Sequence, residues 1–217
     1  MVGDDIMSLK RVSFIYVVAH LVAGCSGMSE QACVTSDWRT VGFEDGTVGR
    51  SEATIGRYRQ QCAEHGIAPD LESYRVGHAD GVQVYCRESN GFAVGHSGAT
   101  YQGVCPADLE RAFIAEYNAG RRLHDLESAL ASVDGRIAGN YRAQENIKQE
   151  LTTIAAKMVA TDTTPEQRVA MVTRSADLGR RYGELTTEIQ QLERERALAE
   201  RDLLDYQQAL AGTFAPP

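Results

Sequence analysis

The rear half of the chain carries apolar residues at alternating steps of three and four, which is the period of an amphipathic helix. Two such series occur, and mostly Glu, Arg, Gln and Ala residues fill the positions between them. Stripes sustained over several heptads predict two long helices that pack along one seam. The first stripe is Leu123, Leu126, Leu130, Val133, Ile137, Tyr141, Gln144, Ile147, Leu151, Ile154 and Met158, and the second is Leu178, Tyr182, Leu185, Ile189, Leu192, Arg196, Ala199, Leu203, Tyr206 and Leu210.

The segment "ATDTTPEQ" separates the two stripes and has the residues of a helix start. Thr164 can act as the N-cap, Pro165 suits the first helical position, and Gln167 completes a capping box. The pattern therefore predicts an antiparallel helical hairpin with its turn near residues 160–165. A hairpin buries only one seam, so self-association into a four-helix bundle would cover more of its apolar surface.

Four glycines inside the stripes allow a second interpretation of the rear half of the chain. Gly135, Gly139, Gly179 and Gly183 each cost a helix about 1 kcal/mol relative to alanine. In the alternative fold, the helices break at these glycines and fold back into a compact bundle.

The front half has a different pattern, in which glycines recur beside aromatic residues. The stretch "DWRTVGFEDG" at residues 37–46 is echoed by "SYRVGHADG" at residues 73–81. If both are helices, the glycines lie on one face of each and permit close backbone packing. Asp70 is then placed to cap the second helix. The two faces are Trp38, Gly42 and Gly46, and Tyr74, Gly77, Gly81 and Tyr85.

A β-hairpin is the alternative for these stretches, because each contains an Asp-Gly pair and Asp-Gly is a strong turn signal. A dinucleotide-binding loop is excluded by spacing. Such a loop needs Gly-x-Gly-x-x-Gly directly after a buried strand. Here Gly42, Gly46 and Gly49 are spaced four and then three, with no Val/Ile-rich strand before them.

The N-terminus has the features of a bacterial export signal. Lys10 and Arg11 precede an apolar run that ends at "VAGC", and the run is too short for a transmembrane helix. The small residues before Cys25 resemble the lipobox of bacterial lipoproteins. That resemblance implies cleavage before Cys25, acylation of its thiol with palmitate, and sorting to the outer membrane, because Ser26 follows rather than Asp.

Four further cysteines, all before residue 106, indicate an oxidising compartment and two disulfides. They allow three pairings. The two sequential closures, Cys33–Cys62 and Cys86–Cys105, are favoured, and each would contribute roughly 3–4 kcal/mol in the chain-entropy model. The net charge of −8 makes nucleic acid an unsuitable partner.

The ordered run of Cys, Gly and aromatic positions in the front half resembles a bacterial lipoprotein family that is known as domain of unknown function 2799. The likeness covers about residues 33–126 and implies an exported lipoprotein without an assigned activity or catalytic residues. The positions that carry it are Cys33, Trp38, Gly42, Asp45, Gly46, Gly49, Cys62, Asp70, Tyr74, Gly77, Gly81, Tyr85, Cys86, Gly91, Gly95, Gly98, Tyr101 to Pro106, Phe113, Tyr117 and Gly120.

Two motifs have residues that could carry chemistry, but packing explains them better. "GHSGA" nearly matches a nucleophile elbow around Ser97, but no series of strands surrounds it and the only later histidine is His124. A metal site from His78, His96, Cys86 and Cys105 lacks the spacing of a known zinc motif. We therefore expect no catalytic residue, no metal and no cofactor.

The sequence as a whole predicts a mainly α protein with a small disulfide-stapled helical N-terminal domain and a long coiled-coil-like hairpin. The expected function is that of a lipid-anchored, non-catalytic interaction or scaffold module. The expected location is the outer membrane, with the protein facing the periplasm; exposure at the cell surface is the alternative. The alternatives are a periplasmic inhibitor or immunity protein and a small hydrolase using Ser97. The expected segments are a signal peptide at 1–24, a linker at 25–32, the first domain at 33–106, the hairpin at 107–212 and a tail at 213–217.

Overall fold

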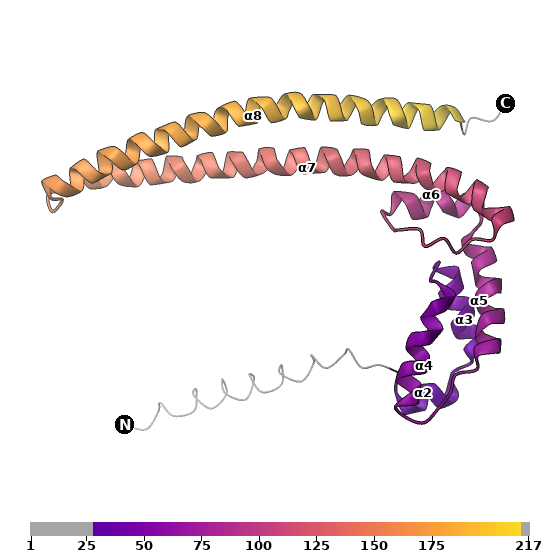
Figure 1. The fold of residues 1–217 in the computed structure, drawn as a ribbon. Helices are drawn as coiled ribbons and strands as arrows, with labels where there is room; N and C mark the ends of the chain where they lie inside the picture. The colour runs from indigo at the N-terminus through magenta and orange to yellow at the C-terminus, as the bar shows by residue number, and fades with distance from the viewer. Residues whose placement is uncertain (1–27, 214–217) are drawn as a thin grey trace, which may run out of the picture. The chain divides into compact units, whose positions relative to one another are not determined.

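The computed structural model describes residues 28–213, so the expected signal peptide, Cys25 and the last four residues lie outside the described residues. Every regular element within the described part is a helix, which confirms the mainly α fold (Figure 1). None of these helices is long and apolar enough to span a membrane. The elements are α2 (Glu30–Thr35), α3 (Trp38–Thr47), the 3₁₀ helix η2 (Glu52–Thr54), α4 (Ile55–Ala63), α5 (Leu71–Tyr85), α6 (Glu88–His96), α7 (Ala107–Met158) and α8 (Pro165–Thr213).

The chain divides into two compact units. Of the described residues, 28–87 and 101–110 form the first unit, and 88–100 and 111–213 form the second. This division differs from the expected boundary after Pro106, because α6 belongs with the hairpin. The disulfide at Cys105 keeps the segment after Tyr101 in the first unit.

The paired glycine stretches are helices, so the β-hairpin interpretation is wrong. Side-chain carboxylates begin both helices: Asp37 accepts from the Arg39 amide at 3.0 Å, and Asp70 accepts from the Ser73 amide at 3.0 Å. Both satisfy amides that a helix start leaves unpaired. The predicted cap at Asp70 is therefore present.

Glycines let α3 and α5 touch backbone to backbone. A Cβ on Gly42 would lie 2.9 Å from the amide nitrogen of His78 and closer still to the Tyr74 carbonyl. A Cβ on Gly77 would meet the Arg39 carbonyl and lie 3.0 Å from the amide nitrogen of Phe43. Because real Cβ atoms do not approach other atoms this closely, only glycine permits the observed distance between the helices.

The contact between α6 and α7 repeats this arrangement in the second unit. A Cβ on Gly95 would lie 2.8 Å from the amide nitrogen of Arg121, and one on Gly120 would lie 2.7 Å from that of His96. The sequences of α3 and α6 align as well. Each helix and the two residues after it contain Gly-Phe-x-x-Gly-x-x-Gly, and the last glycine has a positive φ, 71° at Gly49 and 80° at Gly98. The fold thus contains two versions of one glycine-packed helix pair.

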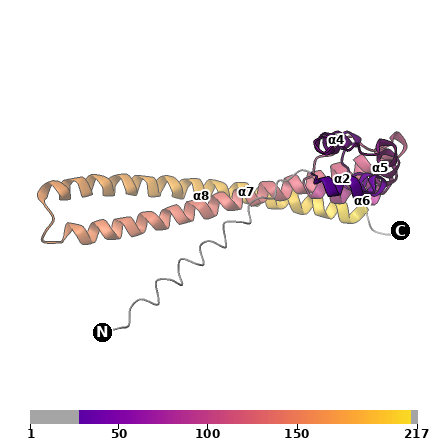
Figure 2. The ribbon, with the colours of Figure 1, turned by 90° about the horizontal axis from the view of Figure 1, so that it is seen from below.

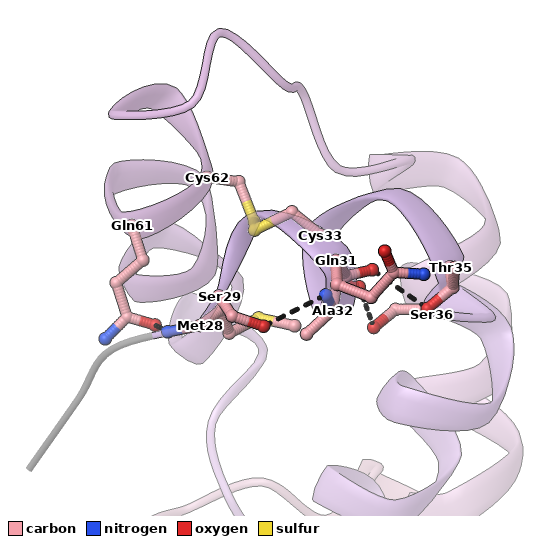
Figure 3. The surroundings of a disulfide bond; sticks show 9 residues. All are labelled: Met28, Ser29, Gln31, Ala32, Cys33, Thr35, Ser36, Gln61 and Cys62. Carbon is pink, nitrogen blue, oxygen red and sulfur yellow. Dashed lines mark hydrogen bonds between the residues drawn. A yellow bond between two sulfur atoms is a disulfide. The ribbon is translucent and has the colours of Figure 1, made fainter.

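The core of the first unit surrounds a disulfide between α2 and α4. Cys33 bonds to Cys62, which joins the six-residue α2 to the longer helix (Figure 3). The Met28 amide also donates to the Gln61 side chain at 3.2 Å. The buried members of this core are Cys33, Trp38, Ile55, Cys62 and Tyr74.

The second unit contains the predicted long hairpin, and the alternative of broken helices is wrong. The α7 and α8 helices run side by side in both views (Figures 1 and 2). At the turn, the Thr164 amide donates to Gln167 Oε1 at 2.8 Å and the Gln167 amide donates to Thr164 Oγ1 at 3.3 Å. These two bonds are the reciprocal capping box that the sequence predicts.

The seam between α7 and α8 is best covered near the turn. Ile147, Ile154, Leu178 and Leu185 form a buried cluster there. Gln144 lies buried in the seam and donates to the Thr186 hydroxyl at 2.8 Å, a polar contact of the kind that specifies register in coiled coils. The stripe residues Leu126 to Ile137 and Ala199 to Leu210 are only half-buried.

Two predicted stripe positions do not lie in the seam. The Tyr141 side chain is half exposed and donates to Glu193 at 3.2 Å. Arg196 is exposed and pairs with Asp134 of α7 at 2.7 Å. Both keep polar groups at the edge of the seam, where they bond to the facing helix without the cost of burial.

Candidate functional site

The most elaborate polar cluster in the first unit surrounds Asp45 on α3, whose side chain is 2% exposed. It accepts from Arg50 Nη1 at 2.7 Å, from the Tyr58 hydroxyl at 3.3 Å and from the Tyr74 hydroxyl at 2.8 Å. The carboxylate is thereby both paired with a charge and hydrogen-bonded, which is the condition for a stable buried charge. Four separate segments are held together by this single residue.

The cluster raises the pKa values of its two tyrosines and its arginine. Burial raises the pKa of the Tyr74 hydroxyl far above its ordinary value, and its hydrogen bond to Asp45 raises it further. Burial likewise raises the pKa of Tyr58, with the negative charge of Asp45 as the next cause. The hydrogen bond to Asp45 raises the pKa of Arg50. The raised pKa values keep the two hydroxyls and the guanidinium protonated at neutral pH, so all three groups donate to Asp45.

We expect the first unit to lose stability in alkali. A tyrosine in the unfolded chain ionises near pH 10, whereas Tyr58 and Tyr74 retain their protons in the folded state. The free energy of unfolding should therefore fall above about pH 10, by up to ~1.4 kcal/mol per pH unit for each group. Denaturant titrations followed by the fluorescence of Trp38, the single tryptophan, would measure it. Tyr101 in the same unit also has a raised pKa. Tyr58→Phe should therefore reduce the slope without removing it, and an unchanged slope would contradict the assignment.

A polar groove of about 370 Å³ lies beside the second disulfide, in the first unit. His78 forms part of its wall. The His78 Nε2–H donates to the Arg50 carbonyl at 2.7 Å, and its ring stacks on Tyr74. Of the other polar residues of the groove, Glu52, Gln83 and Gln102 are exposed and Ser51 is half-buried. The groove therefore offers hydrogen-bonding groups but no charged, buried side chain directed at a ligand.

The Ser97 motif lies just after α6, where its hydroxyl makes local bonds. Ser97 Oγ donates to the Val94 carbonyl at 2.8 Å and accepts from the Ala99 amide at 3.4 Å. His96 Nε2 bonds to Glu127 at 2.8 Å, and His124 Nδ1 donates to the His96 carbonyl at 2.9 Å. Among the described residues, no imidazole hydrogen-bonds to the Ser97 hydroxyl. The structure does not assemble a Ser–His pair here.

The four residues considered for a metal site are not brought together as ligands. Cys86 and Cys105 are bonded to each other, so neither offers a thiolate. His78 belongs to the first unit and His96 to the second. Within residues 28–213, no group of three or more His, Cys, Asp or Glu side chains could hold a metal ion. Cys33–Cys62 and Cys86–Cys105 are the sequential closures that the sequence favoured.

The hairpin turn carries the most exposed apolar surface of the second unit. Val159, Val169 and Val172 are 82%, 68% and 56% exposed. At the same end of the hairpin, an open apolar groove of about 390 Å³ lies between the helices, with Ile154 and Met171 in its wall. Its charged rim includes Arg174, which bonds to both carboxylate oxygens of Glu150 at 2.7 and 3.1 Å. An apolar centre with a polar rim is the usual anatomy of a protein interface.

Sequence reasoning missed two of these features. Asp45 was considered only as part of an Asp-Gly turn signal and of the family pattern, although it lies seven residues after Trp38 and three after Gly42 and so shares their buried face. The valines at the turn were missed because they lie outside the two seam stripes. An exposed apolar residue near a loop has no distinct pattern in a sequence.

Among the comparisons with known proteins, only a family model matches, and it matches the segment that contains the glycine-packed helices. No curated protein and no solved structure matches the chain. A family model does match it over residues 37–122, which include both helix pairs and the second disulfide. Residues 37–122 of this chain thus match the model of the family described as protein of unknown function (DUF2799).

Proposed function

We propose that this protein is a lipid-anchored lipoprotein of the cell envelope that acts as a non-catalytic interaction or scaffold module. The observation that carries the proposal is the uncovered apolar surface at the hairpin turn, formed by Val159, Val169, Val172 and the groove beside Ile154 and Met171. The groove has an apolar centre and a charged rim, and both features are common at sites of protein interaction.

The hairpin supports this function through its geometry. Its two helices of 52 and 49 residues meet along one seam, and beyond the part of α7 that α6 covers, many residues on their outer faces are exposed. The reciprocal capping box at Thr164 and Gln167 holds the turn in one conformation. Ordered apolar side chains lose little conformational entropy on binding, which favours affinity.

The anchor in this proposal is Cys25, which lies outside the described residues. We expect Cys25→Ala to abolish incorporation of labelled palmitate and to move the protein from the membrane fraction to the soluble fraction. Retention of both signals in the variant would contradict lipidation at this residue. The outer membrane is the proposed location because Ser26 follows the cysteine.

Two other functions remain as alternatives. An inhibitor or immunity protein would also use an exposed helix face, and a neighbouring toxin gene would favour it. A hydrolase using Ser97 is less well supported, since the Ser97 hydroxyl bonds to the backbone at Val94 and Ala99. A serine-reactive probe that labels the native protein but not Ser97→Ala would favour the hydrolase.

In-cell photo-crosslinking tests the interaction surface. A photoreactive residue at Val172 should give a discrete crosslinked species, because this side chain lies in the exposed apolar surface. Ala197 is an exposed position on the same helix, away from the turn, and serves as the matched control. Val169→Asp should abolish the species without unfolding the hairpin. A monomer by analytical ultracentrifugation that gives no crosslink at Val172, or equal crosslinks at both positions, would contradict the proposal.

A further inference from the structure

A second groove, of about 460 Å³, lies in the second unit where α6 meets α7. It is lined by Glu88, Ser89, Phe92 and Glu116, and most of its lining is apolar. Glu88 and Phe92 are four residues apart on α6 and so lie on one face of that helix. The groove therefore combines an aromatic wall with two carboxylates.

Glycine packing positions the second carboxylate. Gly91 has no side chain, and a Cβ built there would lie 3.1 Å from the Cβ of Glu116. The stem of Glu116 is therefore held directly against α6, next to the turn that carries Phe92. Both Phe92 and Glu116 are half-buried, which limits how far water can screen a charge between them.

The carboxylates of this groove have no cationic side chain as a partner within the described residues, although Glu88 lies in the first turn of α6, where the helix amides favour a negative charge. Among residues 28–213, no Lys or Arg pairs with Glu88 or Glu116, whereas many other carboxylates of the hairpin have such a partner at 4 Å or less. Two carboxylates beside an apolar wall attract a cation and stabilise it once it is bound.

The first helix pair has a cation at the position that corresponds to Glu88. Arg39 stands three residues before Gly42, as Glu88 stands three residues before Gly91. Arg39 lies one turn before Phe43 and pairs with Asp80 at 2.9 Å. The first pair thus contains its own guanidinium near the phenylalanine, whereas the second pair has a glutamate at that position.

We propose that Glu88, Phe92 and Glu116 form a receptor site for an arginine side chain of a protein partner. A guanidinium can stack on the Phe92 ring and donate to a carboxylate at the same time, which a lysine ammonium does less well. The assignment to a protein partner rests on the proposed function, but the preference of the groove for a guanidinium does not. If the crosslinking test at the hairpin turn gave a negative result, we would still expect this groove to bind a guanidinium.

The probe for this site is N-acetylarginine amide, which carries one charge, titrated into isotope-labelled protein at neutral pH. We expect saturable NMR shifts at residues 88–92 and 116. The neutral citrulline analogue should give none, and the lysine analogue should bind more weakly. Glu116→Gln should weaken binding about fivefold, which corresponds to the loss of one partly exposed ion pair. Phe92→Leu keeps an apolar wall and should also weaken binding.

Asp162→Asn is the matched control, because it removes the same charge from the exposed turn of the hairpin. It should leave the affinity unchanged. Equal weakening in Asp162→Asn and Glu116→Gln would show attraction by net charge alone and overturn the proposal. Non-saturable shifts, or equal binding of the arginine and lysine analogues, would overturn it as well.

Discussion

The substitution Gly77→Ala is expected to unfold the first unit or to destabilise it by at least about 3 kcal/mol. The added methyl group would meet the Arg39 carbonyl and the Phe43 amide nitrogen, which are backbone atoms of α3. A flexible side chain could move aside, but a helix backbone can only move as a whole. Separation of α3 from α5 would also pull the Tyr74 hydroxyl away from Asp45, leaving both polar groups buried without their bond.

Trp38 fluorescence would report this loss, because the single tryptophan is buried in the first unit. The far-ultraviolet circular dichroism of the hairpin should remain. Gly56→Ala is the matched control in the same unit, since a Cβ on this α4 glycine meets nothing within 4 Å. It should stabilise the unit by up to about 1 kcal/mol. A native Trp38 transition in Gly77→Ala would disprove the packing argument.

Removal of the Cys33–Cys62 disulfide is expected to have the next largest effect. The bond closes a separation of 29 residues, so its loss should cost about 3–4 kcal/mol through the entropy of the unfolded chain. It also releases α2, a six-residue helix that is too short to be stable in isolation. Cys33→Ala with Cys62→Ala should therefore destabilise the unit and expose the amides of α2.

Hydrogen exchange would separate these two effects. The amides of α2 should exchange fastest in the double variant, while those of α5 should follow global unfolding of the first unit. The cysteine-free hairpin should keep its native exchange pattern and provides the internal control. Unchanged exchange in α2 would mean that the contact between the Met28 amide and Gln61 is sufficient to hold that helix.

Much of the fold follows from local features of the sequence. Two independent local features predict the hairpin: the three-and-four spacing of its apolar residues and the capping box at Thr164 and Gln167. The cap at Asp70 and the helical spacing of Gly77 and Gly81 likewise act within a few residues. Such features are readable because the atoms involved are neighbours along the chain.

The candidate sites were less predictable, because their residues converge from separate elements. Nothing near Asp45 in the sequence indicates that Tyr58 and Tyr74 will donate to it. Glu116 lies 28 residues after Glu88, and only the glycine contact at Gly91 brings it to the same groove. Burial and proximity depend on how helices pack, which a local pattern does not specify.

The sequence by itself determined the helices, their caps, the cysteine content and the two-part composition of this chain, because each depends on side chains that are close in sequence. Only the tertiary structure decided which helix backbones touch at Gly42, Gly77 and Gly91, why α6 belongs with the hairpin, and where carboxylates remain without a cation. The physical reason is that a missing Cβ creates space everywhere along a helix, but a second backbone fills that space only where the whole fold brings it close.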